Sequence, residues 1–210
     1  MRKLGWLLLC LCVLACGCAK RVPVALASPE QAAATFMDSL VAGDMRSLKA
    51  ACNLSMAEEV ADWAEEPSFV DCTRQLKWSI KSADEVRDAG MLVRVVVALD
   101  RLDYDWIIAK IDEENPDIGL ELEQILEEYV AYLDETENPD SKVEAGYEAR
   151  LVALYRKSNR SFKTLAADPA CPRVEGQVVL TFAFSFTQGE WLLDLDETLN
   201  DALVGRDPLE

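Results

Sequence analysis

The pattern of apolar and polar residues starts at helical spacing. Ser28, Pro29 and Gln31 carry three signals of a helix start: a capping serine, a proline suited to the first turn, and a glutamine that completes a capping box. The apolar residues behind them fall on one helical face, namely Ala33, Phe36, Met37, Leu40 and Val41. Gly43 suits the C-terminal end of this helix. The spacing therefore predicts a helix from residue 29 to about residue 42.

Two shorter helices are predicted next. Asp44 can cap the first of them, which carries Leu48. Ser55 and Glu58 repeat the capping-box spacing before the second, and Pro67 closes it.

The apolar period then changes to two, which is typical of half-buried strands. Apolar and polar residues alternate over 76–81, and 91–99 is rich in valine, with a turn at Asp88-Ala89-Gly90 between them. A second pair of strands is predicted at 178–186 and 191–195, joined by Gln188-Gly189. The chain is therefore predicted to contain two β-hairpins.

Residues 101–168 lie between these two β-hairpins, and a loop of that length without structure would be unusual. Two apolar stripes at helical spacing predict helices there: Leu122, Ile125, Leu126, Tyr129, Val130 and Leu133, then Val143, Tyr147, Leu151, Leu154 and Tyr155. Their charges are opposite, because 103–140 holds 14 acids and one base, whereas 142–163 holds six bases and two acids. We expect a helical hairpin in which the two charged faces meet.

Taken together, these elements predict an α+β fold in which N-terminal helices pack on a curved antiparallel sheet. The opening Ser28-Pro29-Glu30 and the phrase Leu40-Val41-Ala42-Gly43-Asp44 resemble the nuclear transport factor 2-like, or cystatin-like, cone, and in particular small uncharacterised bacterial lipoproteins with that fold. The resemblance covers 28–100 and 173–197, and it makes 101–168 a helical insertion. It implies a cavity between helices and sheet; some members, such as ketosteroid isomerase, are enzymes, and many only bind.

The predicted domain accordingly spans 28–197, and 198–210 is interpreted as a C-terminal tail.

The first fifteen residues have the character of an export signal. Arg2 and Lys3 precede twelve apolar or small residues, a run too short to span a bilayer comfortably. The run ends in Val13-Leu14-Ala15-Cys16, which resembles the lipobox of bacterial lipoproteins. The resemblance implies cleavage after residue 15 and lipidation of Cys16, with 16–27 as a tether.

The resemblance also bears on location. Gly17 follows Cys16 where an aspartate would imply retention at the inner membrane, so the outer membrane, facing the periplasm, is favoured. Two alternatives stay open: Cys18 is a weaker lipidation site, and the chain is a soluble secreted protein if it is cut elsewhere.

Composition excludes several classes of function. The formal net charge is −17 and histidine is absent. Catalytic systems built on Ser-His or Cys-His pairs and histidine-ligated zinc are thereby excluded. The acidity also argues against binding to nucleic acid, whose phosphates require a basic face. Half of the residues are hydrophobic, which is enough to fill a core.

Export would place the cysteines in a compartment where disulfides persist. Cys18, Cys52, Cys72 and Cys171 remain after removal of the signal and lipidation of Cys16, and we expect Cys52 to pair with Cys72 across a local loop. The spacings match no metal site, and we predict no metal and no cofactor.

Candidate chemistry is sparse. Asp194 and Asp196 alternate with apolar residues on the last predicted strand, where two neighbouring carboxylates could raise each other's pKa and act as a general base. The alternative is the solvent face of an edge strand. A set of aromatic residues either lines a pocket for an apolar ligand or forms the core: Trp63, Trp78, Phe182, Phe184, Phe186 and Trp191.

Two charged clusters have further interpretations. The acids from Asp100 to Asp117 lack the glycine of a calcium loop, which favours a solvated acidic face. The bases Arg156, Lys157, Arg160 and Lys163 could contact anionic lipid, but pairing with the acidic helix is the simpler expectation.

The sequence therefore favours a lipid-anchored envelope protein without catalysis. Such a protein would act as a binding or interaction module through the mouth of the cone or through the charged insertion, whose partner would be a protein. Two alternatives remain: a carrier of a small apolar ligand, and a cavity enzyme that uses Asp194 or Asp196.

Overall fold

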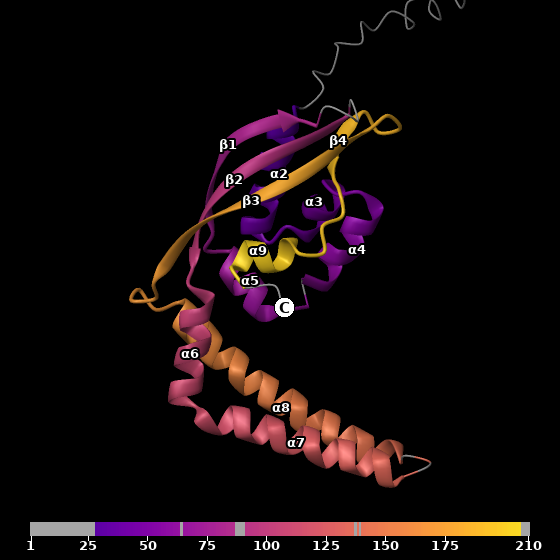
Figure 1. Cartoon of the computed structure of the whole chain (residues 1–210), viewed down its shortest axis with the longest axis vertical. Coiled ribbons are helices and arrows are strands. Elements are labelled where there is room, and N and C mark those ends of the chain that lie inside the picture. The colour runs from indigo at the N-terminus through magenta and orange to yellow at the C-terminus, as the bar shows by residue number, and fades with distance from the viewer. Residues whose placement is uncertain (1–27, 64, 87–90, 137, 139, 207–210) are drawn as a thin grey trace, which may run out of the picture.

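The computed structural model describes residues 28–63, 65–86, 91–136, 138 and 140–206. The predicted signal sequence, Cys16 and the tether lie outside these residues, as does Cys18. The fold is α+β, as the sequence predicts: helices pack against an open antiparallel sheet (Figure 1).

The sheet has four strands in the order β1-β2-β3-β4, all antiparallel to their neighbours. Their bounds are Lys77–Glu85 for β1, Leu92–Leu102 for β2, Arg173–Ser185 for β3 and Glu190–Leu193 for β4. The two predicted β-hairpins are confirmed, and β2 pairs with β3 along its whole length, from Leu92 opposite Ala183 to Leu102 opposite Arg173. The register between β1 and β2 shifts between Ile80 and Ser82.

Four helices precede the sheet: α2 Pro29–Ala42, α3 Met45–Ala50, α4 Leu54–Trp63 and α5 Pro67–Thr73. The predicted capping box is present, since the Gln31 backbone N–H donates to Ser28 Oγ (3.3 Å) and the Ser28 N–H donates to Gln31 Oε1 (3.0 Å). Gly43 ends α2 with a φ of +67°, a conformation that costs little only for glycine. Helix α5 was not predicted.

The core lies between one face of the sheet and these helices. Many of its fully buried side chains come from α2, α4 and the two central strands, including Phe36, Met37, Met56, Val95, Val97, Leu180 and Phe182. Helix α2 and a C-terminal helix, α9 (Leu199–Val204), lie against this face, and the opposite face carries no described helix (Figure 1).

The predicted end of the domain at residue 197 is wrong, because the segment 198–210, interpreted as a tail, contains helix α9. Leu199, Leu203 and Val204 of this helix are each about 1 % exposed, and the helix contacts α5 and the sheet. Helix α9 therefore belongs to the fold. Its apolar residues are too few for a recognisable helical period.

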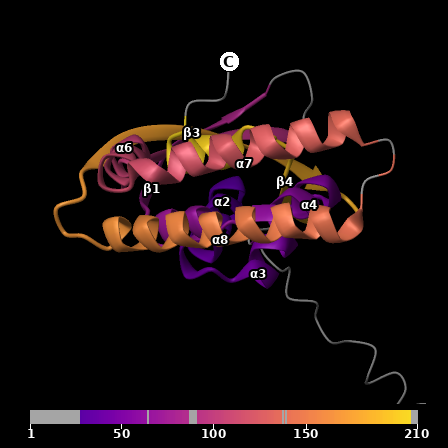
Figure 2. The same cartoon turned by 90° about the horizontal axis from the view of Figure 1, so that it is seen from below.

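Three helices connect β2 to β3: α6 Tyr104–Glu114, α7 Pro116–Glu135 and α8 Ser141–Ala166. Helices α7 and α8 lie side by side and project from the rest of the molecule (Figures 1 and 2). We call α7 and α8 the arm, and the sheet with α2–α5 and α9 the body. The arm joins the body through α6 and through the C-terminal end of α8, where Phe162, Leu165 and Ala166 are buried.

Candidate functional site

The two candidate catalytic carboxylates lie beyond the end of β4, because that strand stops at Leu193. Asp194 Oδ1 accepts hydrogen bonds from Asn53 Nδ2 (2.5 Å) and from the Leu195 N–H (3.0 Å). Asp196 Oδ1 accepts from the Thr198 N–H (3.0 Å) and hydroxyl (2.8 Å). Both line an open depression of about 430 Å³ on the surface. Their contacts give both carboxylates a structural role in shaping the turn between β4 and α9.

The structure divides the six candidate aromatic residues among separate places. Trp63 packs on Phe69, with ring centroids 5.2 Å apart, and both line a small cavity of about 150 Å³ among α2–α5. Phe182 is fully buried in the core. Phe184, Phe186 and Trp191 form an edge-to-face cluster at the end of the sheet, where Phe186 is 78 % exposed because β3 ends one residue earlier. They do not surround one pocket.

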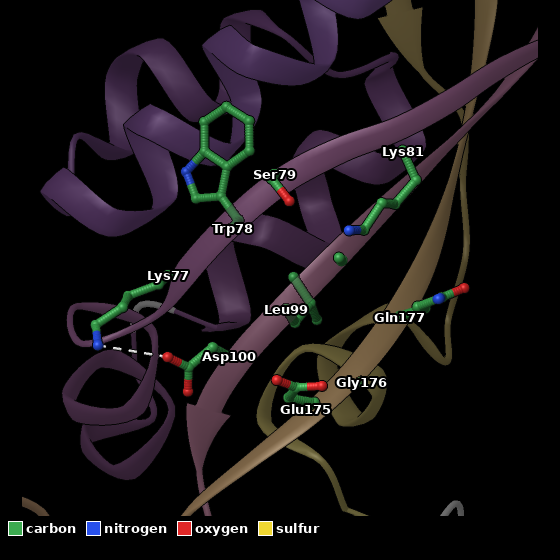
Figure 3. A pocket seen from close by; sticks show the side chains of 10 residues that line it. Lys77, Trp78, Ser79, Lys81, Leu99, Asp100, Glu175, Gly176 and Gln177 are labelled. Carbon is green, nitrogen blue, oxygen red and sulfur yellow. Dashed lines mark ion pairs between the residues drawn. The ribbon is translucent and has the colours of Figure 1, made fainter.

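Trp78 lies at a pocket of about 490 Å³ that crosses β1, β2 and β3 (Figure 3). The lining is polar and includes Lys81, Glu175 and Gln177. Asp100 in this pocket pairs with Arg173 (2.6 Å) and Lys77 (3.4 Å). The hydrogen bond from Arg173 lowers the pKa of Asp100 below its ordinary value. This pocket was not predicted from the sequence, where its one signal is the polar half of the strand alternation.

The predicted disulfide between Cys52 and Cys72 is absent from the structure, in which both are buried free thiols. Cys52 lies beside β4, where its backbone forms an isolated parallel β-bridge with Leu193. Its thiol donates a hydrogen bond to the Leu48 carbonyl (3.2 Å). Cys72 lies in α5. Proximity in sequence suggested the pairing, but α4 separates the two residues along the chain. Burial raises the pKa of each thiol to about 12, so neither is a thiolate nucleophile at neutral pH.

The arm confirms the predicted pairing of opposite charges only in part. Lys157 Nζ lies 2.5 Å from Asp117 Oδ2, and Arg150 Nη1 lies 2.5 Å from Glu128 Oε2. Arg156, Arg160 and Lys163, which we expected to pair with the acidic helix, take part in none of the ion pairs found among the described residues. Arg156 and Arg160 line a cleft instead.

This cleft, which we call the root cleft, lies between α8 and the start of α5. It has a volume of about 560 Å³ and is lined by Pro67, Val152, Tyr155, Arg156, Asn159 and Arg160. It forms where the arm leaves the body, so one wall belongs to each. Tyr155 belongs to a predicted apolar stripe, but the spacing of that stripe does not show that Tyr155 faces the body.

Most of the exposed large apolar side chains lie on the arm. Among the described residues thirteen such side chains are exposed, and eight of them belong to α7 or α8: Leu120, Leu122, Leu126, Val130, Leu133, Val143, Val152 and Tyr155. The exposed fraction is 68 % for Leu120 and 55 % for Val130. This concentration makes the arm the leading candidate for a functional surface.

Arg206 fastens the base of the arm to the body. Its guanidinium pairs with Glu66 at the start of α5 and lies 4.7 Å from the centroid of the Tyr104 ring in α6. Burial alone would raise the pKa of Glu66, but hydrogen bonds from Arg206 and Ser68 outweigh it and hold that pKa below its ordinary value. This cluster connects α5, α6 and the segment after α9.

In the part of the chain that the structure describes, no helix is long and apolar enough to cross a membrane. The same residues contain no group of three or more metal-binding side chains placed to hold an ion. Comparison with known proteins found no match for this chain, whether with protein-family models, with curated proteins or with solved structures.

Proposed function

We propose that this protein is a lipid-anchored, non-catalytic interaction module of the bacterial cell envelope, and that the arm binds a protein partner. The observation that carries the proposal is the set of eight exposed apolar side chains on α7 and α8. Soluble proteins seldom leave such side chains clustered on one element unless they cover an interaction site.

The construction of the arm supports this function. The arm makes its own narrow core, in which Ile125 is fully buried and Leu154 is 6 % exposed. Tyr147 of α8 packs on Tyr129 and Tyr132 of α7, with ring centroids 5.1 and 6.1 Å apart. The exposed leucines and valines keep 38–68 % of their surface in contact with solvent, so a partner can reach them.

The position of the proposed anchor agrees with this role. The acyl chains would be attached to Cys16, and the protein would sit on the outer membrane and face the periplasm. Helix α2 begins at the end of the molecule opposite the arm (Figure 1). A tether of residues 16–27 reaches at most about 40 Å when extended. This arrangement allows the arm to point away from the bilayer, toward other envelope proteins.

We also propose that the body is a nuclear transport factor 2-like cone and that α6–α8 are an insertion in it. The support is the order of its elements, with N-terminal helices packed on an antiparallel sheet and the Gly43-Asp44 turn at the end of α2. On this view the insertion adds the binding surface to a domain whose own cavities are small or open.

Site-specific photo-crosslinking tests the proposed function. A photoreactive residue is placed at Val130 on the arm or, as a matched control, at Val179 on the open face of the sheet, where the exposure is similar. We expect one discrete protein adduct from the full-length lipidated chain in its native cells with the probe at Val130 and none with the probe at Val179. Equal adducts at the two positions, or none at several arm positions, would refute the function.

A further inference from the structure

We infer that the occupant of the arm is a basic amphipathic helix, seated between the arm and the body with its C-terminal end at the root cleft. This inference rests on the proposed function, because it names the chemistry of the partner that the arm binds. Three features of the arm carry it: one apolar side shared by both helices, an unpaired acidic rim, and two arginines at the root.

Leu122, Leu126 and Leu133 of α7 and Tyr155 of α8 lie on the same side of the arm, whereas the exposed Leu120 lies on another face of α7. Ile125 and Leu154 are buried, and the aromatic contacts of Tyr129 and Tyr147 show that these faces meet. Leu126 and Tyr155 each follow a buried residue by one position, which is about 100° further round its helix. In two antiparallel helices, turns of equal size in the same sense lead to the same side.

That shared side faces the body. Tyr155 and Val152 line the root cleft together with Pro67 of α5, and Figure 2 shows both arm helices in front of the body in the view from below. Leu122, Leu126 and Leu133 continue the apolar side along α7. The result is a solvent-exposed apolar strip that runs from the root cleft along α7, which suits a helix that buries one apolar face against it.

The outer edge of this strip is acidic. Glu123, Glu127 and Asp134 each follow one of the exposed leucines and so lie next to the strip on the solvent side. None of the three takes part in the ion pairs found among the described residues. Basic side chains on the occupant would pair with these carboxylates, and charge complementarity of this kind selects the partner and speeds association.

The root end has the opposite sign. Arg156 and Arg160 line the root cleft, and there the C-terminal end of a helix fits best, because its free carbonyl groups carry partial negative charge. The signs at the two ends therefore set the direction in which the helix lies.

A second copy of this chain suits the strip less well. Residues 103–140 alone carry a net charge of −13, and the whole chain carries −17, so two copies repel each other over most of their surfaces. A basic partner is attracted by the same field. Self-association is thus an outcome that the experiment must be able to detect.

The test uses the mature chain, residues 16–210 with Cys16→Ser, and three fluorescent helical peptides. The peptides share one leucine-rich face and carry lysine, glutamine or glutamate on the polar face; a length of about 18 residues gives a helix of about 27 Å. Binding is measured by fluorescence anisotropy at about 20 and 300 mM salt, since screening weakens charge pairing. We expect the lysine peptide to bind at least about tenfold more tightly than the glutamine peptide and to lose most of that advantage at high salt.

Variants locate the bound peptide. Leu126→Ser should weaken binding of the lysine peptide about tenfold, whereas the matched control Val179→Ser on the sheet should leave it unchanged. A photo-crosslinker at the C-terminal end of the peptide should label α8 near Tyr155, and one at its N-terminal end should not.

Each contrary outcome overturns a stated part. Equal binding of the glutamate or glutamine peptide overturns the basic partner but leaves the arm as a binding surface. Binding that is insensitive to Leu126→Ser places the peptide elsewhere and overturns the groove, and labelling of Tyr155 from the N-terminal end overturns the direction. Dimers in sedimentation that Leu126→Ser abolishes identify a second copy as the occupant. If no peptide binds, the inference fails, and the crosslinking from Val130 decides separately whether the arm binds a protein.

Discussion

The two helices of the arm are held together by few buried side chains, and Ile125 is the central one. Its side chain is fully buried between α7 and α8, whereas its neighbour Leu126 is 45 % exposed. Ile125→Ala removes apolar volume from the middle of the arm without touching the body. The matched control Leu126→Ala removes a side chain of the same size from the exposed strip.

The expected magnitudes differ strongly. Truncation of a fully buried isoleucine to alanine costs about 2–5 kcal/mol. Each 1.4 kcal/mol is a factor of ten in an equilibrium constant, so opening of the arm should become about 30-fold to 4,000-fold more frequent. Leu126→Ala should cost less than about 1 kcal/mol, because about half of that side chain already contacts water.

Hydrogen exchange measured by mass spectrometry on the intact chain resolves this effect by region. Amides open locally with free energies that range from near zero up to that of global unfolding. We expect Ile125→Ala to speed exchange in α7 and in α8 up to about Leu154, with no change in β2 and β3. The main contacts of α7, which carries Ile125, are with α8 and α6 and not with the strands that hold Val95 and Leu180.

Two results would refute the reasoning. Faster exchange in β2 and β3 by the same factor would show that arm and body unfold as one cooperative unit. Exchange in α7 that matches the Leu126→Ala control would show that Ile125 is not the central contact between the helices.

Three further predictions concern the body. Gly43→Ala places a side chain at a φ of +67°, and the free energy of unfolding in urea should fall by about 1–2 kcal/mol; an unchanged value would contradict the left-handed turn. Asp194→Ala removes the acceptor for Asn53 and should cost about 1–3 kcal/mol in the same assay; an equally stable variant would contradict the structural role of Asp194. The ion pair of Glu66 with Arg206 lowers the pKa of Glu66, so its contribution is complete above the ordinary pKa of 4.5 and disappears as the pH falls through the lowered pKa. The difference in melting temperature between wild type and Glu66→Gln should therefore be constant from pH 7 to about 5 and shrink below about 4; a difference independent of pH would contradict this link.

The sequence predicted the features that depend on local chemistry. The start of α2 at Ser28 and its end at Gly43 follow from capping and from backbone conformation, which involve only neighbouring residues. The two β-hairpins follow from alternation that one buried sheet face imposes. The charge reversal between α7 and α8 likewise predicted two helices that lie together.

Features that depend on tertiary contacts could not be predicted in this way. The end of β4 at Leu193 moves Asp194 from a strand face into a turn, and no local signal marks that boundary. Whether Cys52 and Cys72 form a disulfide depends on the distance between them in the folded chain, which their spacing in the sequence does not give. The apolar stripe of α7 contains both Ile125 and Leu126, and only the position of α8 decides which of them is buried. The root cleft could not be predicted from local patterns either, because its walls come from α5 and α8, which are far apart in the sequence.

The arm is attached to the body by two legs and not by one. Leu102 and Arg173 are paired at the end of the sheet, and just beyond them the Asp103 N–H donates to the Pro172 carbonyl (3.0 Å), so both legs leave the sheet side by side. Because the two legs leave side by side and α8 also packs on α5, a rotation of the arm about its long axis would break contacts on both legs. The arm is therefore held at its root in one orientation relative to the body.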